Sequence, residues 1–246
     1  MADSSFLLNL ACLLTAAGAN VLGGAIVARG SWSAEWLRYF IALGAGFMLS
    51  AVITKMIHEA ARLTPAAPIL VLAGYLLVHL FEHTVAPHFH FGEETHHEHH
   101  LDRSTSFSAL VGLWIHSFFD GVSISSGFII DRGFGLLLFA AIVLHKAPEG
   151  FTIASIVRAA GGDAQSALAA AAAIGAASVL GGLVVFGAPT LVGVALSVSA
   201  GVTLYVAASD LIPEVNQDAS PAIAWTVFAG VVLYYATEQL LEHFGI

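Results

Sequence analysis

The stretch GAGFMLSAVITKMIHEA, residues 44–60, decides the fold, because the chain repeats it as SAGVTLYVAASDLIPEV, residues 199–215. The two stretches align without a gap, and their identical residues include a glycine, at Gly46 and Gly201, and a glutamate near the end. Each belongs to an apolar run of about 20 residues or more, which is the length that crosses a bilayer as a helix. The repeated unit is therefore a membrane span.

The repeat extends to the neighbouring apolar runs. AGYLLVHLFE (73–82) matches AGVVLYYATE (229–238), and the VLGG of 21–24 returns as the VLGG of 179–182. The first three apolar runs thus match the last three in the same order, which chance similarity between Ala-rich and Gly-rich segments explains poorly. Equivalent runs are an odd number of spans apart, so they must cross a membrane in opposite directions. Such an inverted repeat is common among secondary transporters.

Composition places the whole chain in a membrane. Of its 246 residues, 58% are apolar and only 10% are charged, whereas about 25% are charged in an ordinary soluble domain. We therefore predict an all-α polytopic membrane protein, one domain over 1–246, with eight transmembrane helices in a 3+2+3 arrangement. The fourth and fifth helices have no partner in the repeat and are expected between its halves. The predicted spans are 6–28, 36–58, 67–86, 106–129, 133–157, 165–187, 190–211 and 222–242.

Charge and cysteine content exclude other classes. With 8 basic and 17 acidic residues, the formal net charge is −9, so the basic surface that nucleic-acid binding needs is absent from the sequence. The one cysteine, Cys12, allows no disulfide within the chain and no cysteine metal site. No basic residue precedes the first apolar run, so we expect a retained helix rather than a cleaved signal peptide. The expected partners are divalent ions and the lipid bilayer, and a homodimer is left open.

Arginines indicate the orientation. With the N-terminus outside, four arginines lie on the cytoplasmic side and two outside, in agreement with the positive-inside rule. We therefore expect a multi-pass protein of the plasma or inner membrane whose termini both face outward. The cytoplasmic arginines are Arg29, Arg38, Arg103 and Arg158, and the outer ones are Arg62 and Arg132.

The fourth and fifth spans contain the candidate metal-binding residues. The fourth contains His116 and Asp120, and the fifth contains His145 and Glu149. The spacing within each pair puts imidazole and carboxylate on one helical face. Polar groups at this depth are costly, so they pair, bind an ion or face a wet cavity. Hydrogen bonding between the helices is one interpretation, but two such pairs on consecutive spans favour a four-ligand metal site. The ligands suit zinc, and also iron, manganese or cadmium.

With these motifs the sequence resembles the ZIP (Zrt/Irt-like protein) family of zinc and iron transporters. The resemblance rests on HSFFDG (116–121) and HKAPEG (145–150) in spans four and five of eight, on the 3+2+3 plan, and on a histidine-rich loop after the third span. It implies transport of divalent metal into the cytoplasm, with both termini outside. It also implies that the four ligands form the primary transport site, which Met48 of the second span either joins or borders as an ordinary core residue.

Two positions depart from the family pattern. Many relatives have asparagine after the first histidine and an acid after the second, and these residues build a second metal position. Here Ser117 and Lys146 stand there. Because an ammonium repels a metal cation, we predict a mononuclear centre in which Lys146 replaces the second cation, a variant that resembles an HKAP-type subgroup. Lys55 stands where relatives often have histidine, and its repeat equivalent is Asp210, so we expect charge compensation by these two near the pathway.

Further polar residues are candidates for metal entry and exit. Glu59 and Glu214 are repeat equivalents near opposite faces, and they either collect cations or are solvated helix ends. His79 and Glu82, at the end of the third span, either extend the path or make core hydrogen bonds. The loop 88–104, placed in the cytoplasm, is either a weak metal-binding segment or a solubilising loop. Its histidines are His88, His90, His96, His97, His99 and His100.

These features predict transmembrane transport of divalent transition metal, with zinc as the expected substrate, by alternating access of the two halves. Protonation of the histidines opposes binding, so affinity is expected to fall as the pH drops. The alternative is an intramembrane zinc-dependent hydrolase, in which a carboxylate acts as general base on a metal-bound water. The sequence contains no HExxH motif, and hydrolysis needs no inverted repeat, so we expect a transporter and not an enzyme.

Overall fold

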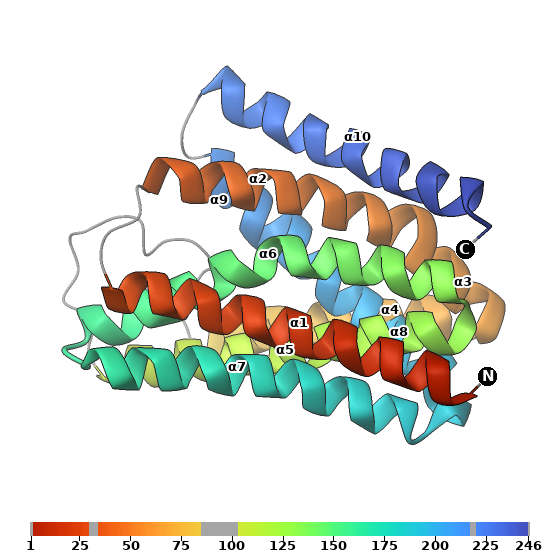
Figure 1. Ribbon diagram of the computed structural model, residues 1–246, viewed down its shortest axis with the longest axis horizontal. Helices are drawn as coiled ribbons and strands as arrows, with labels where there is room; N and C mark the ends of the chain where they lie inside the picture. The colour runs from red at the N-terminus through yellow and green to blue at the C-terminus, as the bar shows by residue number, and fades with distance from the viewer. Residues whose placement is uncertain (1, 30–33, 85–102, 217–219, 246) are drawn as a thin grey trace.

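The computed structural model describes residues 2–29, 34–84, 103–216 and 220–245. Every regular element among them is a helix, and the long helices form one bundle in which the start of α1 and the end of α10 lie at the same end (Figure 1). The elements are α1 (Ala2–Arg29), α2 (Ala34–Ala51), η1 (Val52–Met56), α3 (Ile57–Leu63), α4 (Ala67–Thr84), α5 (Arg103–Ile130), α6 (Arg132–Ala159), α7 (Ala164–Phe186), η3 (Pro189–Leu191), α8 (Val192–Tyr205), η4 (Val206–Leu211), α9 (Ile212–Asn216) and α10 (Pro221–His243).

The helices have the length and composition of membrane spans. Within the described residues, seven helical stretches are long and apolar enough to cross a bilayer, including Trp36–Leu63 and Pro189–Asn216. Helix α10 has 23 residues, as many as α7, and packs against α2 (Figure 1). The predicted all-α, multi-span class is confirmed. The second and seventh spans are longer than predicted, because the chain continues as helix through α3 and α9.

Aspartates cap two long helices at their starts. Asp131 accepts a hydrogen bond from the backbone N–H of Phe134, at 3.0 Å, where α6 begins. Asp163 accepts one from the backbone N–H of Ser166, at 2.8 Å, where α7 begins. Such caps satisfy N–H groups that lack partners inside the helix. The side chain and backbone N–H of Ser166 also lower the pKa of the Asp163 carboxyl.

Close glycine contacts reveal the repeat in three dimensions. Helix α2 packs on α10 as its repeat equivalent α8 packs on α4. In both pairs a Cβ atom on either glycine would overlap with a backbone carbonyl of the facing helix, so the backbones are in direct contact. The four contacts are Gly46 with Val227, Gly230 with Leu43, Gly201 with Val71, and Gly74 with Val198.

The central helices α5 and α6 follow the same symmetry. Gly121 and Gly150, which end the two motifs, lie against the carbonyls of Ser178 on α7 and Asn20 on α1. Because α1 and α7 carry the repeated VLGG, the pair α1–α6 is equivalent to the pair α7–α5. The fourth and fifth spans thus make matching contacts, each with the first helix of one half of the repeat.

Two π-helical turns occupy equivalent places in the two halves. Segment η1 interrupts the second span and η4 the seventh, so that Thr54 corresponds to Ser209 and Lys55 to Asp210. A π turn inserts one residue into an α-helix, and such turns are frequent at functional sites. The amino-acid pattern did not predict either turn.

Candidate metal centre

Four side chains from α5 and α6 converge inside the bundle. His116 and Asp120 come from α5, His145 and Glu149 from α6, and each is at most 5% exposed. One potential ligand atom from each residue lies within 4.8 Å of those of the other three. The four-residue spacing in each motif produces this arrangement, because it places both side chains on the face that looks toward the neighbouring helix.

Asp120 lies between the two imidazoles. Its Oδ2 is 3.2 Å from Nε2 of His116 and 3.2 Å from Nε2 of His145, and the two rings have centroids 5.5 Å apart. The other carboxylate oxygen, Oδ1, is buried and has no hydrogen-bond partner among the described residues. A buried carboxylate oxygen without a donor is costly, so the arrangement suits an added cation.

Lys146 is at the centre of the cluster, with no exposed surface. Its Nζ is 2.6 Å from Oδ2 of Asp120 and 2.5 Å from Oε2 of Glu149, and it donates to Oγ of Ser117 at 2.6 Å. The three hydrogens of the ammonium therefore each have an acceptor. Ser117 in turn donates to Oε1 of Glu149. Lys146 does not extend to a membrane interface, and it neutralises one of the two carboxylates.

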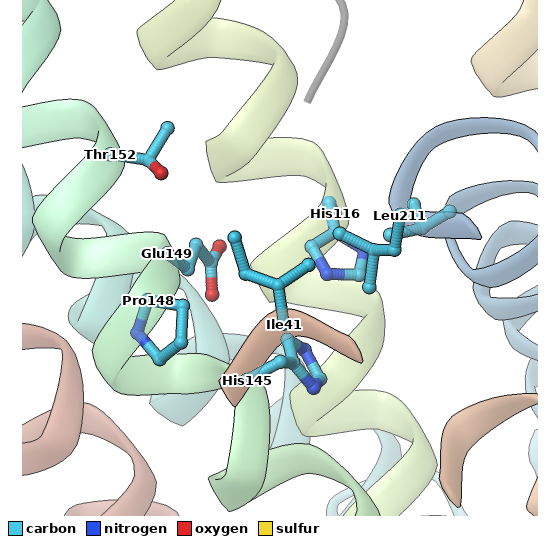
Figure 2. Close-up of a pocket in the computed structure, with 8 residues that line it drawn as sticks. Ile41, His116, His145, Pro148, Glu149, Thr152 and Leu211 are labelled. Carbon is cyan, nitrogen blue, oxygen red and sulfur yellow. The ribbon is translucent and has the colours of Figure 1, made fainter. Parts of the chain in front are cut away.

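A small cavity adjoins the cluster. Its volume is about 20 Å³, which is room for about one water molecule or one bare ion. Figure 2 shows His116, His145 and Glu149 around it together with Ile41 of α2. The π turn η4 forms another part of the wall. The lining residues are Ile41, His116, His145, Pro148, Glu149, Thr152, Val206 and Leu211.

The structure separates the two charges that were expected to compensate each other. Lys55 pairs with Glu238 of α10, with Nζ and Oε1 3.0 Å apart, and not with Asp210. Asp210 is 3% exposed and interacts with Glu82 of α4. Lys55 and Asp210 are equivalent in the repeat, and this equivalence itself keeps them apart, since inverted halves place equivalent residues toward opposite ends of the bundle.

The remaining predicted residues lie away from the cavity wall. Glu59 is bound by Arg62 at 3.1 Å. Glu214 is only 7% exposed, so the interpretation as a solvated helix end does not fit it. Met48 is fully buried in the core, and the α2 residue that lines the cavity is Ile41, about two turns away. The six histidines of the loop 88–104 lie outside the described residues.

Sequence reasoning missed several residues of the site. Ile41, Val206 and Leu211 are apolar residues in apolar helices, and no pattern distinguishes them from lipid-facing neighbours. Glu238, the partner of Lys55, carried a usable signal, because it is the repeat equivalent of Glu82 in the matched stretches 73–82 and 229–238.

The profile of the ZIP zinc transporter family matches residues 102–238, from the start of α5 into α10 and across the whole cluster. The chain belongs to the ZIP zinc transporter family. Among the relatives of this ZIP protein are Zinc transporter ZIP9 of Xenopus tropicalis and that of Micropogonias undulatus, 27% and 28% identical over 171 residues. These matches cover 65% of the chain and 56% and 54% of the relatives, so the chain spans about half their length. Family and helices together make it an integral multi-pass membrane protein.

Proposed function

We propose that this ZIP family member carries zinc across its membrane toward the cytoplasm through the cluster of His116, Asp120, His145 and Glu149. The observation that carries the proposal is the convergence of these ligands, within 4.8 Å of one another, inside a membrane-spanning bundle. Groups of this kind at such depth are too costly to lack a role. The names of its relatives support zinc as the substrate.

The ligand chemistry fits a divalent transition metal. Two imidazoles and two carboxylates make a set of four, the number that zinc prefers in protein sites. Iron, manganese and cadmium accept the same donors, so selectivity must come from geometry and supply rather than from ligand type. The Oδ1 atom of Asp120 has no hydrogen-bond partner among the described residues. A metal ion can bind it without displacing a protein donor.

Lys146 limits the site to one ion. Its ammonium contacts Ser117, Asp120 and Glu149, where family members of the common pattern hold a second metal. With imidazoles neutral, two carboxylates and one lysine leave one net negative charge, which one divalent ion overcompensates. We propose that this fixed cation defines the HKAP-type variant. A fifth ligand from Met48 remains a prediction.

Transport occurs by alternating access, which is common among transporters built from inverted repeats. The two π turns are the points where each half departs from regular helix, and η4 lines the cavity through Val206 and Leu211. Glu59 and Glu214, in equivalent helices of the two halves, serve as cation collectors at the entrance and the exit. The loop 88–104 receives metal on the cytoplasmic side, and the protein resides in the plasma or inner membrane.

The hydrolase alternative has no observation in its favour. A hydrolytic zinc site keeps a carboxylate available as general base for a metal-bound water. In this cluster Lys146 engages both carboxylates, so neither is available. The family profile is that of transporters.

Zinc uptake into proteoliposomes with an enclosed fluorescent zinc indicator tests the proposal. We expect His145→Ala and Glu149→Ala to abolish uptake, because each removes one ligand of a four-ligand site. The matched control is His58→Ala, which removes an exposed histidine and is expected to leave uptake unchanged. Wild-type uptake by both ligand variants, reconstituted at equal density, would remove the assignment.

A further inference from the structure

The two π turns make matching contacts with their neighbouring helices. In η1, Thr54 donates to the hydroxyl of Tyr234 on α10, at 2.9 Å. In η4, the equivalent Ser209 is hydrogen-bonded to the hydroxyl of Tyr75 on α4, at 2.7 Å. Each turn is thus joined to a helix of the other half of the repeat by one hydroxyl–tyrosine pair. The next residue in each turn, Lys55 or Asp210, interacts with a glutamate of that same helix.

These second contacts differ in charge. Lys55 forms a salt bridge with Glu238, 3.0 Å long and partly exposed. At the other turn, Asp210 of η4 interacts with Glu82 of α4, and both residues are only 3% exposed. The η1 turn therefore supplies a cation to the glutamate that faces it, whereas the η4 turn presents a second carboxylate.

The Asp210 side chain lacks a protein donor. Both of its carboxylate oxygens are buried without a hydrogen-bond partner among the described residues, whereas Oε2 of Glu82 accepts a hydrogen bond from Tyr205 at 2.8 Å. Two adjacent buried carboxylates cannot both remain ionised, because desolvation and mutual repulsion act together. The pair must hold a proton or another cation.

The surroundings favour the proton. From α4 the pair is flanked by Tyr75 and His79, whose rings lie 4.9 Å and 6.0 Å from that of Tyr205 on α8. Helices α2 and α9 also pack against η4, and α9 brings the buried Glu214. Among the described residues, the cluster of α5 and α6 is the only group of three or more histidine, cysteine or acidic side chains arranged to hold a metal.

We propose that Glu82 and Asp210 share one proton and form a proton-binding site coupled to metal transport. This inference rests on the proposed function, and it adds a second substrate to it. The coupling element is η4, because Asp210 is followed directly by Leu211, which lines the metal cavity together with Val206. Loss of the proton to water leaves two carboxylate charges that repel each other. The repulsion moves η4 away from α4 and thereby changes the cavity wall.

Infrared difference spectroscopy of the purified full-length protein detects the proton directly. Between neutral and alkaline pH, where exposed carboxyl groups are already ionised, a buried protonated carboxylic acid gives a carbonyl stretching band that a carboxylate lacks. We expect this band in the wild type, its loss in Asp210→Asn and in Glu82→Gln, and its retention in Glu238→Gln, the matched variant of the other half. A band that survives in both Asp210→Asn and Glu82→Gln would overturn the proposal, and the two variants serve as independent tests should one fold poorly.

Two further measurements separate this proposal from its rivals. Bound zinc per chain is expected to be the same in the wild type and Asp210→Asn, and a loss of one ion in Asp210→Asn overturns the proposal in favour of a metal at the pair.

In proteoliposomes, wild-type zinc flux is expected to change by up to about tenfold per pH unit, as linkage to one proton allows. The flux of Asp210→Asn is expected to lose most of this dependence. If the wild type carries no zinc at all, the proposed function fails while the infrared result still decides the proton site.

Discussion

Replacement of Lys146 by aspartate tests how the centre balances charge. In the wild type, the ammonium lies against Asp120 and Glu149, so one bound zinc ion leaves the site with a single positive charge. In Lys146→Asp three carboxylates remain, and two zinc ions are needed to reach the same net charge. The space left by the ammonium is lined by oxygens of Ser117, Asp120 and Glu149, which are suitable ligands for the second ion.

The repulsion that we expect to exclude a second ion from the wild type is large. The ammonium nitrogen is 2.6 Å from Oδ2 of Asp120, and the ligand atoms lie within 4.8 Å of one another. Two unit charges at about 4 Å interact by about 4 kcal/mol at an effective dielectric constant near 20, so a divalent ion experiences about 8 kcal/mol of gross repulsion from Lys146. Competing protonation of the carboxylates in the variant offsets part of this gain.

Equilibrium dialysis against zinc followed by elemental mass spectrometry measures the number of bound ions. We expect one zinc in the wild type, two in Lys146→Asp, and one in Lys146→Leu, which removes the charge but adds no ligand. One ion in Lys146→Asp, or two in the wild type, would refute the reasoning. Zinc competition against a chelator is expected to show tighter binding by Lys146→Leu than by the wild type, by about tenfold or more, since part of the repulsion is relieved.

Three further predictions concern binding, packing and capping. Zinc is expected to raise the melting temperature of the wild type but not of His145→Ala, measured by a thermal shift assay, because only the folded site binds the ion. Gly121→Ala is expected to cost about 1–3 kcal/mol of folding free energy, since its Cβ overlaps with the carbonyl of Ser178, whereas Gly18→Ala, which has open space around it, is expected to gain up to about 1 kcal/mol. Equal melting temperatures of the two glycine variants would contradict this. Because hydrogen bonding to Ser166 lowers the pKa of Asp163, its cap stabilises α7 at neutral pH and is lost as the pH falls through that lowered pKa. Hydrogen exchange in the first turn of α7 is expected to rise in acid in the wild type and to be high at all pH values in Asp163→Ala.

The spans and the ligand cluster were accessible from the sequence because local rules govern them. A run of apolar residues specifies a span by its length, and the interval between His116 and Asp120, or between His145 and Glu149, fixes a helical face. The contact between α5 and α6 followed from their adjacency in the chain. These features depend on neighbouring residues and one short connection.

Other features depend on how distant helices meet, and the sequence left them undetermined. The partner of Lys55 is Glu238, far along the chain, and only the crossing of η1 with α10 selects it over Asp210. The π turns arise in segments such as VITKM (52–56) that contain no glycine or proline to signal an irregular helix. The His-x3-acid-Gly pattern recurs in α5 and α6. Only the packing of α6 on α1 and of α5 on α7 shows that the two helices occupy matching places in the bundle.

The glycine contacts arrange the helices in four tightly packed pairs, or two-helix bodies, of which α1–α6 and α5–α7 also meet each other closely at Gly175 and Ala17 and at Gly127 and Gly135. Backbone touches backbone in α2–α10, α4–α8, α1–α6 and α5–α7, so neither member of a pair has room to slide past the other. The cavity draws its walls from α2, α5, α6 and η4, which continues α8, and thus from every one of the four bodies. A cross-link within one pair is expected to leave zinc uptake unchanged, whereas a cross-link from α2 or η4 to α5 or α6 beside the cavity is expected to abolish it.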